Sequence, residues 1–267
     1  MTADNKLAVY SERIAVVLCA VSFLNLLSTA FFPAQHLPVT GVQIQMLALL
    51  ALCFVHAAGT KGWKKTLGFS VISFIISWFV EFIGCNYGWW FGDYEYTPAL
   101  GYAIGNVPLM VVVSWDVVIY PSLLLVDELM GTEQARSENG NWLLRIVLAS
   151  GATALVTTAW DLTTDPIAIE EGWWKWDFGG AYLPEVSGGV PFSNFWGWIG
   201  AVFIISFLYR YLFVLAGEAA RTTTAHTLRS GEQPRLALAV YGSLLGHLLL
   251  RAFARAQRVH GAMLARG

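Results

Sequence analysis

TLGFSVISFIISWFVEFIGC, residues 66–85, is the stretch that decides the class of fold. From Thr66 to Val80 it contains no charged side chain. An apolar run of about 20 residues is long enough to cross the hydrocarbon layer of a membrane as a helix. Glu81 follows near its end, and a carboxylate at membrane depth is costly enough to indicate a function. The stretch therefore predicts a transmembrane helix that ends in a functional acid.

Similar apolar runs recur along the chain. Of its 267 residues, 56% are hydrophobic and 13% are charged, and the mean hydropathy is +0.56. Such a composition is typical of a chain whose solvent is lipid. Besides 66–85, the runs that predict crossings lie at about 13–32, 42–58, 107–126, 143–164, 194–215 and, less regularly, 236–250. We expect an all-α fold, a polytopic transmembrane helical bundle of six or seven crossings that forms a single integral membrane domain over residues 1–267.

The last of these runs is ambiguous. It is short, and Arg251, Arg255 and Arg258 follow it at helical spacing. A crossing at 236–250 would carry those arginines to the outer side. The C-terminal basic segment 236–267 therefore fits two interpretations, a seventh crossing and an interfacial helix on the cytoplasmic side.

Basic residues predict the orientation. Lys61, Lys64 and Lys65 lie between the second and third runs, and Arg210 is counted with the loop after the sixth. The loop 86–106 contains no Lys or Arg. By the positive-inside rule we expect a multi-pass protein of the cell membrane with a cytoplasmic N-terminus.

The chain also contains an internal repeat. EFIGCNYGWWFGDY at residues 81–94 matches DPIAIEEGWWKWDF at residues 165–178, with an acid, a Gly-Trp-Trp and an Asp-aromatic pair at the same spacing. Further on, Val-Pro followed by Trp recurs at Val107 to Trp115 and at Val190 to Trp198. Tryptophan is too rare for this agreement to be chance.

The repeat predicts the architecture around the acids. Each unit, at about 66–126 and 143–215, reads as an outward helix ending in a carboxylate, an aromatic outer loop and a returning helix opened by proline. Because the two outward helices run in the same direction, the units are predicted to be parallel repeats about an axis along the membrane normal. Glu81 and Asp165 should then lie at similar depth and face one another.

Four acids are candidates for catalysis because their predicted positions lie within the membrane: Glu81, Asp116, Asp161 and Asp165. Asp116 falls near the bilayer middle. Asp161 and Asp165 are four residues apart, so they share one helix face. Two carboxylates so close in apolar surroundings do not both ionise easily, and the one that keeps its proton is suited to general acid catalysis. The structural alternative for each acid is an interhelical hydrogen bond or a solvated helix end.

Aromatic residues cluster around these acids. An interfacial belt explains most of them. The faces of Trp and Tyr also stabilise a cation without attacking it, which suits a carbocation intermediate. On this second interpretation the candidate substrate-binding residues are Trp90, Tyr94, Tyr96, Trp115, Trp174 and Asn194, although Asn194 is also placed to cap a helix.

Other classes of site receive no support from the sequence. Cys19, Cys53 and Cys85 are scattered without metal-ligand or disulfide spacing, and the five histidines are dispersed, so we expect no metal. The net charge of −2 indicates no nucleic-acid surface. The acid chemistry needs no cofactor.

Taken together, these motifs resemble the membrane carotenoid hydratase family. The first repeat contributes Glu81 to Gly84, Tyr94 to Thr97, Leu100-Gly101, Val107 to Leu109 and Trp115. The second contributes Asp161-Leu162, Asp165-Pro166, Gly172, Trp174 to Trp176, Gly180, Tyr182, Val190-Pro191, Asn194-Phe195 and Gly197-Trp198. The resemblance covers about residues 70–215. The stretch 183–187 looks longer than the family's usual turn, a departure that bears on end-group recognition.

The resemblance implies addition of water across the terminal isopropylidene double bond of an acyclic carotenoid, giving a tertiary alcohol. Asp165 or Asp161 would protonate the alkene, and a second carboxylate such as Glu81 would orient or deprotonate the water. The implied partners are a carotenoid or other isoprenoid, the lipid bilayer and, by association, other carotenoid enzymes.

Three alternatives remain open at the level of sequence. An integral-membrane terpene cyclase uses the same acid chemistry with internal capture of the cation. A prenyltransferase would need magnesium and an aspartate pair, which Asp161 and Asp165 do not supply as adjacent residues. A non-enzymatic lipid or solute transporter with parallel repeats would release no altered product.

Overall fold

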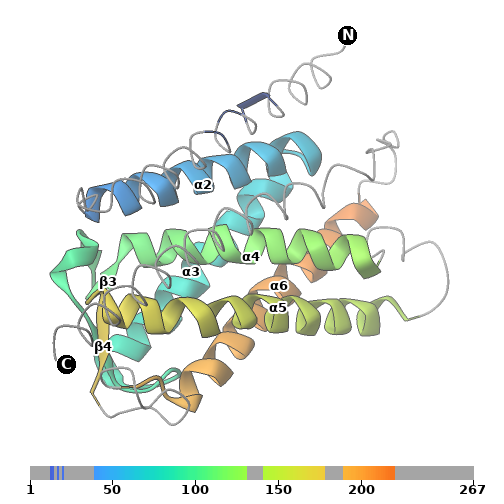
Figure 1. The fold of residues 1–267 in the computed structure, drawn as a ribbon. Coiled ribbons are helices and arrows are strands. Elements are labelled where there is room, and N and C mark those ends of the chain that lie inside the picture. The colour runs from blue at the N-terminus through green and yellow to red at the C-terminus, as the bar shows by residue number, and fades with distance from the viewer. Residues whose placement is uncertain are drawn as a thin grey trace, which may run out of the picture.

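Five long helices form the body of the protein (Figure 1) in the computed structural model, which describes residues 39–130, 141–177 and 189–219 and the single positions 13, 14, 17 and 20. The helices are α2 (Val39–Thr60), α3 (Trp63–Tyr87), α4 (Leu109–Met130), α5 (Trp142–Glu170) and α6 (Phe192–Ala219). Each is long and apolar enough to cross a membrane. They correspond to five of the predicted crossings, which confirms a mostly helical membrane protein. The predicted crossing at 236–250, the basic segment 236–267 and nearly all of 13–32 lie outside the described residues.

Four of these helices surround a common interior. α4 packs against α3 and α5, and α6 packs against the same two helices on the other side, so that α3 and α5 lie diagonally opposite. α2 lies outside this group and packs against α3 and α4.

Two helices each contribute a row of polar side chains to the interior of the bundle. On α3 the buried face includes Ser70, Ser73, Ser77 and Glu81, and on α5 it includes Thr153, Thr157, Asp161 and Asp165. Steps of three and four residues keep these side chains on one face of each helix. The opposite faces are apolar and exposed, as at Ile75 and Leu155. Because lipid is the surrounding solvent, these helices expose apolar faces, and the acids point into the protein.

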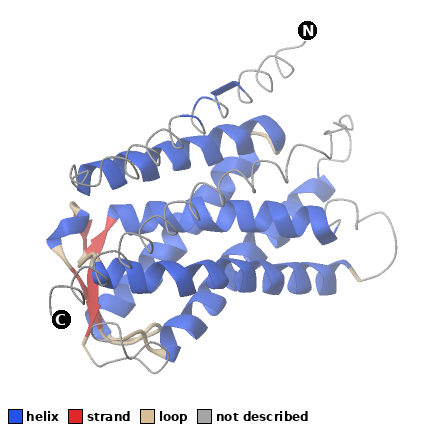
Figure 2. Cartoon of the chain, in the orientation of Figure 1, coloured by secondary structure: helices blue, strands red, loops and turns tan. Residues whose placement is uncertain are grey.

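A small sheet closes one end of the bundle (Figure 2). β1 (Tyr94–Tyr96) pairs antiparallel with β4 (Trp174–Trp176), with Tyr94 opposite Trp176 and Tyr96 opposite Trp174. A 3-10 turn at Pro98–Leu100 and the pair β2 (Ala103–Ile104) and β3 (Val107–Pro108) lead into α4.

Between these aromatic pairs, Glu95 and Lys175 are opposite each other and form an exposed ion pair. The hydrogen bond to Glu95 and its negative charge raise the pKa of Lys175. Strand alternation therefore directs the aromatic rings to the bundle and the ion pair away from it.

Two helices extend beyond their predicted ends. α3 continues past Glu81 to Tyr87, and Gly88 terminates it with a left-handed φ of 66° while its N–H donates to Gly84 O. α5 continues through Pro166 to Glu170. The prediction that each helix ends in its carboxylate was therefore wrong. A proline lacks one N–H donor, which a membrane helix tolerates when neighbouring groups satisfy the freed carbonyl.

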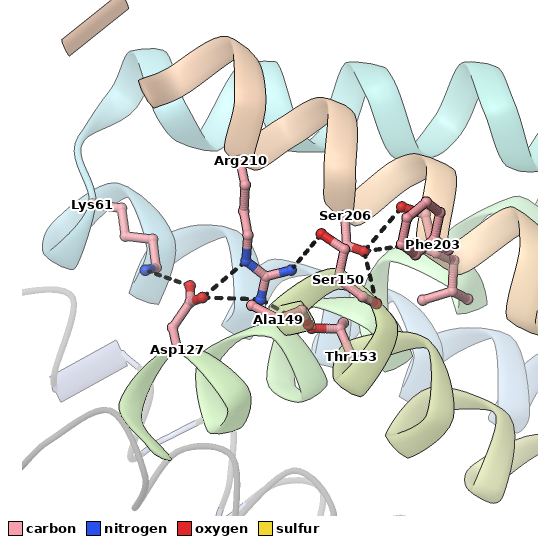
Figure 3. A network of polar contacts seen from close by, with 9 residues as sticks. Lys61, Asp127, Ala149, Ser150, Thr153, Phe203, Ser206 and Arg210 are labelled. Carbon is pink, nitrogen blue, oxygen red and sulfur yellow. Dashed lines mark hydrogen bonds and ion pairs between the residues drawn. The ribbon is translucent and has the colours of Figure 1, made fainter. Parts of the chain in front are cut away.

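The end of the bundle opposite the sheet contains a buried ion-pair network (Figure 3). Arg210 on α6 donates from Nε and Nη2 to Asp127 Oδ1 on α4, at 3.0 and 2.9 Å, and Lys61 Nζ lies 3.6 Å from Asp127 Oδ2. Arg210 also reaches the hydroxyls of Ser150 and Thr153 on α5. The prediction that Arg210 belongs to a loop was therefore wrong, because its guanidinium pairs with a buried carboxylate inside the helix bundle.

Candidate active site

A cavity of about 150 Å³ lies at the sheet end of the bundle. Three of the predicted acids line it together: Glu81 from α3, and Asp161 and Asp165 from α5. All three are buried, with at most 5% of each residue exposed. The remaining lining residues are Gln43, Met46, Phe91, Tyr94, Tyr96, Leu100, Met110, Val111, Ser114, Trp115, Val118, Trp160, Thr164, Ala168, Trp173, Trp174, Trp176, Asn194 and Trp198.

Glu81 is held by three neutral donors. Tyr94 Oη and Tyr96 Oη both donate to its Oε2, at 2.5 and 2.6 Å, and Trp115 Nε1 donates to Oε1 at 2.8 Å. Hydrogen bonds of this kind stabilise the ionised form of a carboxylate. The arrangement therefore fixes the side chain of Glu81 and favours its negative charge.

The two tyrosines keep their phenolic protons. Burial, followed by the charge of Glu81, raises the pKa of Tyr94 and of Tyr96 well above the ordinary value. Tyr94 reaches Glu81 because residue 84 is a glycine: a Cβ there would lie 2.6 Å from Tyr94 Oη. Both hydroxyls are thus available as donors throughout the neutral range.

Asn194, near the start of α6, joins the two aspartates. Its Nδ2 donates to Asp161 Oδ2 at 2.8 Å and to Asp165 Oδ2 at 2.7 Å. Trp174 Nε1 from β4 donates to Asp165 Oδ1 at 2.6 Å. Within the described part of the chain, Asp165 accepts two side-chain hydrogen bonds at these distances and Asp161 accepts one. The pair is therefore asymmetric, with Asp161 the less compensated carboxyl group.

Among the described residues, the three acids of the cavity have no basic side chain beside them. No Lys, Arg or His is among the residues that line the cavity. Nor do the described ranges contain three His, Cys, Asp or Glu side chains grouped to hold a metal ion. With only neutral donors nearby, three ionised carboxylates would repel one another in apolar surroundings. The geometry favours a proton shared among the acids.

Aromatic rings form much of the cavity wall. Trp115 and Trp198 stack face to face, with ring centroids 4.0 Å apart and planes 4° from parallel. Tyr94 contacts Trp176 and Tyr96 contacts Trp174 across the β1–β4 pair. Trp176 Nε1 is buried and interacts with the carboxyl group of Asp165, although it makes no hydrogen bond of regular geometry among the described residues. The wall thus combines ring faces with a buried indole N–H close to Asp165.

Two predicted site residues lie elsewhere. Trp90 does not line the cavity; its Nε1 donates to Gly197 O at 2.9 Å and joins the loop after α3 to the start of α6. Asp116 is buried on the side of α4 that faces α3, where Ser70 Oγ donates to its Oδ2 at 3.3 Å. The structure does not bring either side chain to the three acids.

Sequence reasoning missed several residues of the cavity wall, among them Trp198, Trp176 and Trp160. The repeat contained a usable signal for Trp198, because it occupies the position in the second unit that Trp115 occupies in the first. Trp176 required the register of β1 and β4. No sequence signal singled out Trp160.

Comparisons with known proteins identify a family and a curated relative. A family model described as carotenoid biosynthesis protein matches residues 41–256. Over 148 residues the chain is 28% identical to bisanhydrobacterioruberin hydratase of Haloarcula japonica, an alignment that covers 55% of this chain and 45% of that protein. The chain thus matches less than half the length of this curated relative. No solved structure matches.

Proposed function

The chain belongs to the carotenoid biosynthesis protein family, and we propose that it adds water across the terminal isopropylidene double bond of an acyclic carotenoid. The observation that carries the proposal is the convergence of Glu81, Asp161 and Asp165 on one aromatic cavity inside a membrane protein. The chemistry named for the distant relative, a hydratase, agrees with it. The proposed enzyme is a hydro-lyase of the carotenoid 1,2-hydratase type.

Asp161 is proposed as the proton donor. Of the three acids it accepts the fewest side-chain hydrogen bonds among the described residues, so its anion is the least stabilised and the shared proton resides there. It transfers that proton to the less substituted alkene carbon. The π electrons form the new C–H bond and leave a tertiary cation on the neighbouring carbon.

The carbocation then lies between the negative charge of Glu81 and the faces of aromatic rings. Glu81, whose anion is stabilised by hydrogen bonds from Tyr94, Tyr96 and Trp115, would supply the compensating negative charge. The stacked pair of Trp115 and Trp198 offers aromatic surface that stabilises a cation without forming a bond to it.

Water capture completes the reaction. The attacking water would lie beside Asp165, where Trp176 Nε1 makes no hydrogen bond of regular geometry and could donate to it. The water oxygen bonds to the tertiary carbon, and its proton passes to the Asp165 carboxylate. Asp165 returns the proton to Asp161, its neighbour four residues away, so the site is reset with one water consumed and no net proton change.

The predicted duplication fits the same scheme. Ser77 and Glu81 on α3 occupy the positions that Asp161 and Asp165 occupy on α5, 84 residues later. We propose that parallel repeats with an axis along the membrane normal brought the acids together, within a single domain over residues 1–267 whose N-terminus is cytoplasmic.

The direct test is expression of the chain in a host that accumulates acyclic carotenoids, with mass spectrometry of the pigments. We expect a product heavier by one water. A product of unchanged mass but shifted absorption would indicate the cyclase alternative, and unaltered pigments beside well-folded protein would contradict hydration when several acyclic precursors have been tried.

Deuterium labelling separates the roles of the two aspartates. Purified Asp165→Asn in D2O should protonate the alkene and then lose the proton again, so recovered substrate gains deuterium at its end group. Asp161→Asn should give neither product nor label. Label in Asp161→Asn but not in Asp165→Asn would reverse the assignment.

A further inference from the structure

The cavity around the acids is too small for the whole of the proposed substrate. A cavity of about 150 Å³ in another protein accommodates benzene, so the similar volume here suits one isoprenoid end group. The remainder of a long chain must leave the cavity along a defined path. The β1–β4 pair covers the sheet end, so that path lies elsewhere.

Six lining residues flank the acids along two helices. On α4 they are Met110, Ser114 and Val118, and on α5 they are Ala168, Thr164 and Trp160. Both sets advance by four residues, and the helices are neighbours that run in opposite directions. The span from Met110 to Val118 is roughly 12 Å at the helical rise per residue. We call this lining the α4–α5 slot.

The surface of the slot is effectively apolar. Ser114 Oγ donates to Val111 O of its own helix at 2.7 Å, and Thr164 Oγ1 donates back to Trp160 O and Asp161 O, both at 3.3 Å. With both hydroxyls turned to their own backbones, the slot presents methylene, methyl, thioether and indole groups. These contacts suit a hydrocarbon and offer nothing to a polar solute.

The slot also reaches the side of the bundle. Met110, Ser114, Thr164 and Trp160 are half-buried, as is Met46 on α2, whereas the acids are buried. Four of the six slot residues are therefore more exposed than the acids, whereas Val118 and Ala168 are buried. A chain lying there would have its end group at the carboxylates and its length directed into the lipid beside α4 and α5.

We infer that the α4–α5 slot binds the isoprenoid chain next to the reacting end group and sets the preference for long substrates. The inference rests on the proposed hydratase function. Ser114 on α4 and Thr164 on α5 both line the cavity, so a bulky side chain at either position would occupy the space of the chain without removing any of the three acids.

The test uses full-length protein in detergent with acyclic isoprenoid hydrocarbons that share one end group and differ in chain length. Ser114→Trp fills the slot. Leu155→Trp places the same side chain on the lipid-facing side of α5, where Leu155 is 58% exposed. For the wild type, turnover should rise with chain length until the chain outgrows the slot.

In Ser114→Trp we expect turnover of the longest substrate to fall by about tenfold or more, a typical penalty for a misfitting apolar pocket, with the shortest nearly unaffected. Leu155→Trp should follow the wild type. Equal losses at every length, no loss at any length, or a flat wild-type profile would overturn the inference that the slot binds the chain.

Thr164→Leu, a smaller change on the α5 side of the slot, is the second variant if Ser114→Trp does not fold, and the same selective loss of the longest substrate is expected. A wild type that converts no member of the series refutes hydration itself, a distinct result.

Discussion

The two ends of the bundle bury carboxylates in opposite ways. Asp127 is paired with Arg210 and Lys61, and its charge is compensated by two cations. At the sheet end Glu81, Asp161 and Asp165 meet only neutral donors from Tyr, Trp and Asn among the described residues. A buried carboxylate beside cations joins helices through its ion pairs, whereas one without a cation is suited to holding and exchanging a proton. The same residue type thus serves structure at one end and, in the proposed function, chemistry at the other.

The largest effect should come from removing the proton at the sheet end. Asp161→Asn keeps the shape of the side chain but cannot donate an acidic proton, and hydration should fall by about 10²–10⁴-fold, the usual contribution of a general acid. Insertion and thermal stability in detergent should be retained. Product formation measured by mass spectrometry at wild-type rates would remove Asp161 from the mechanism.

The matching change at the other end should affect stability instead. Asp127→Asn leaves Arg210 and Lys61 buried beside a neutral amide, and we expect the free energy of unfolding to fall by about 3–5 kcal/mol. Turnover per folded molecule should stay near the wild-type value. Thermal unfolding in detergent, with activity normalised to folded protein, gives both quantities.

A double variant sharpens this result. Asp127→Asn combined with Arg210→Met should lose less stability than the sum of the two single changes, because the unpaired guanidinium is then absent. Strict additivity would show that the contact seen in Figure 3 does not stabilise the fold.

A smaller effect is expected from the hydrogen bonds that stabilise the Glu81 anion. Tyr94→Phe removes one donor, and hydrogen bonds to charged groups contribute about 1.5–3 kcal/mol, so turnover should fall by roughly tenfold to a hundredfold. The loss should appear in kcat rather than in KM, since the charge matters once the cation forms. A change confined to KM would indicate that Tyr94 only shapes the cavity.

The smallest effect should come from the exposed ion pair on the sheet. Lys175→Gln breaks the pair with Glu95 outside the cavity, where solvent screens the charges. Neither the unfolding temperature nor turnover should change measurably. A clear loss of activity would show that the charge on the sheet contributes to the site after all.

The class of fold could be predicted from the chain itself. Apolar runs of membrane length correspond to α2 through α6, because a lipid-facing helix must display its hydrophobicity along its whole length. The acids were also recognisable, since charge within such a run is conspicuous. The spacing of Asp161 and Asp165 was enough to place them on one face, and Asn194 bridges both.

Only the tertiary structure decided which residues meet. Asp116 looked equivalent to the other acids by depth, yet its side of α4 faces Ser70 rather than the cavity. On sequence alone Arg210 counts with a loop, but in the structure it lies inside the bundle and pairs with Asp127, 83 residues earlier. Depth is a property of position along one helix, which the sequence encodes directly. Direction and partner depend on how helices pack, and that follows from contacts between segments far apart in the chain.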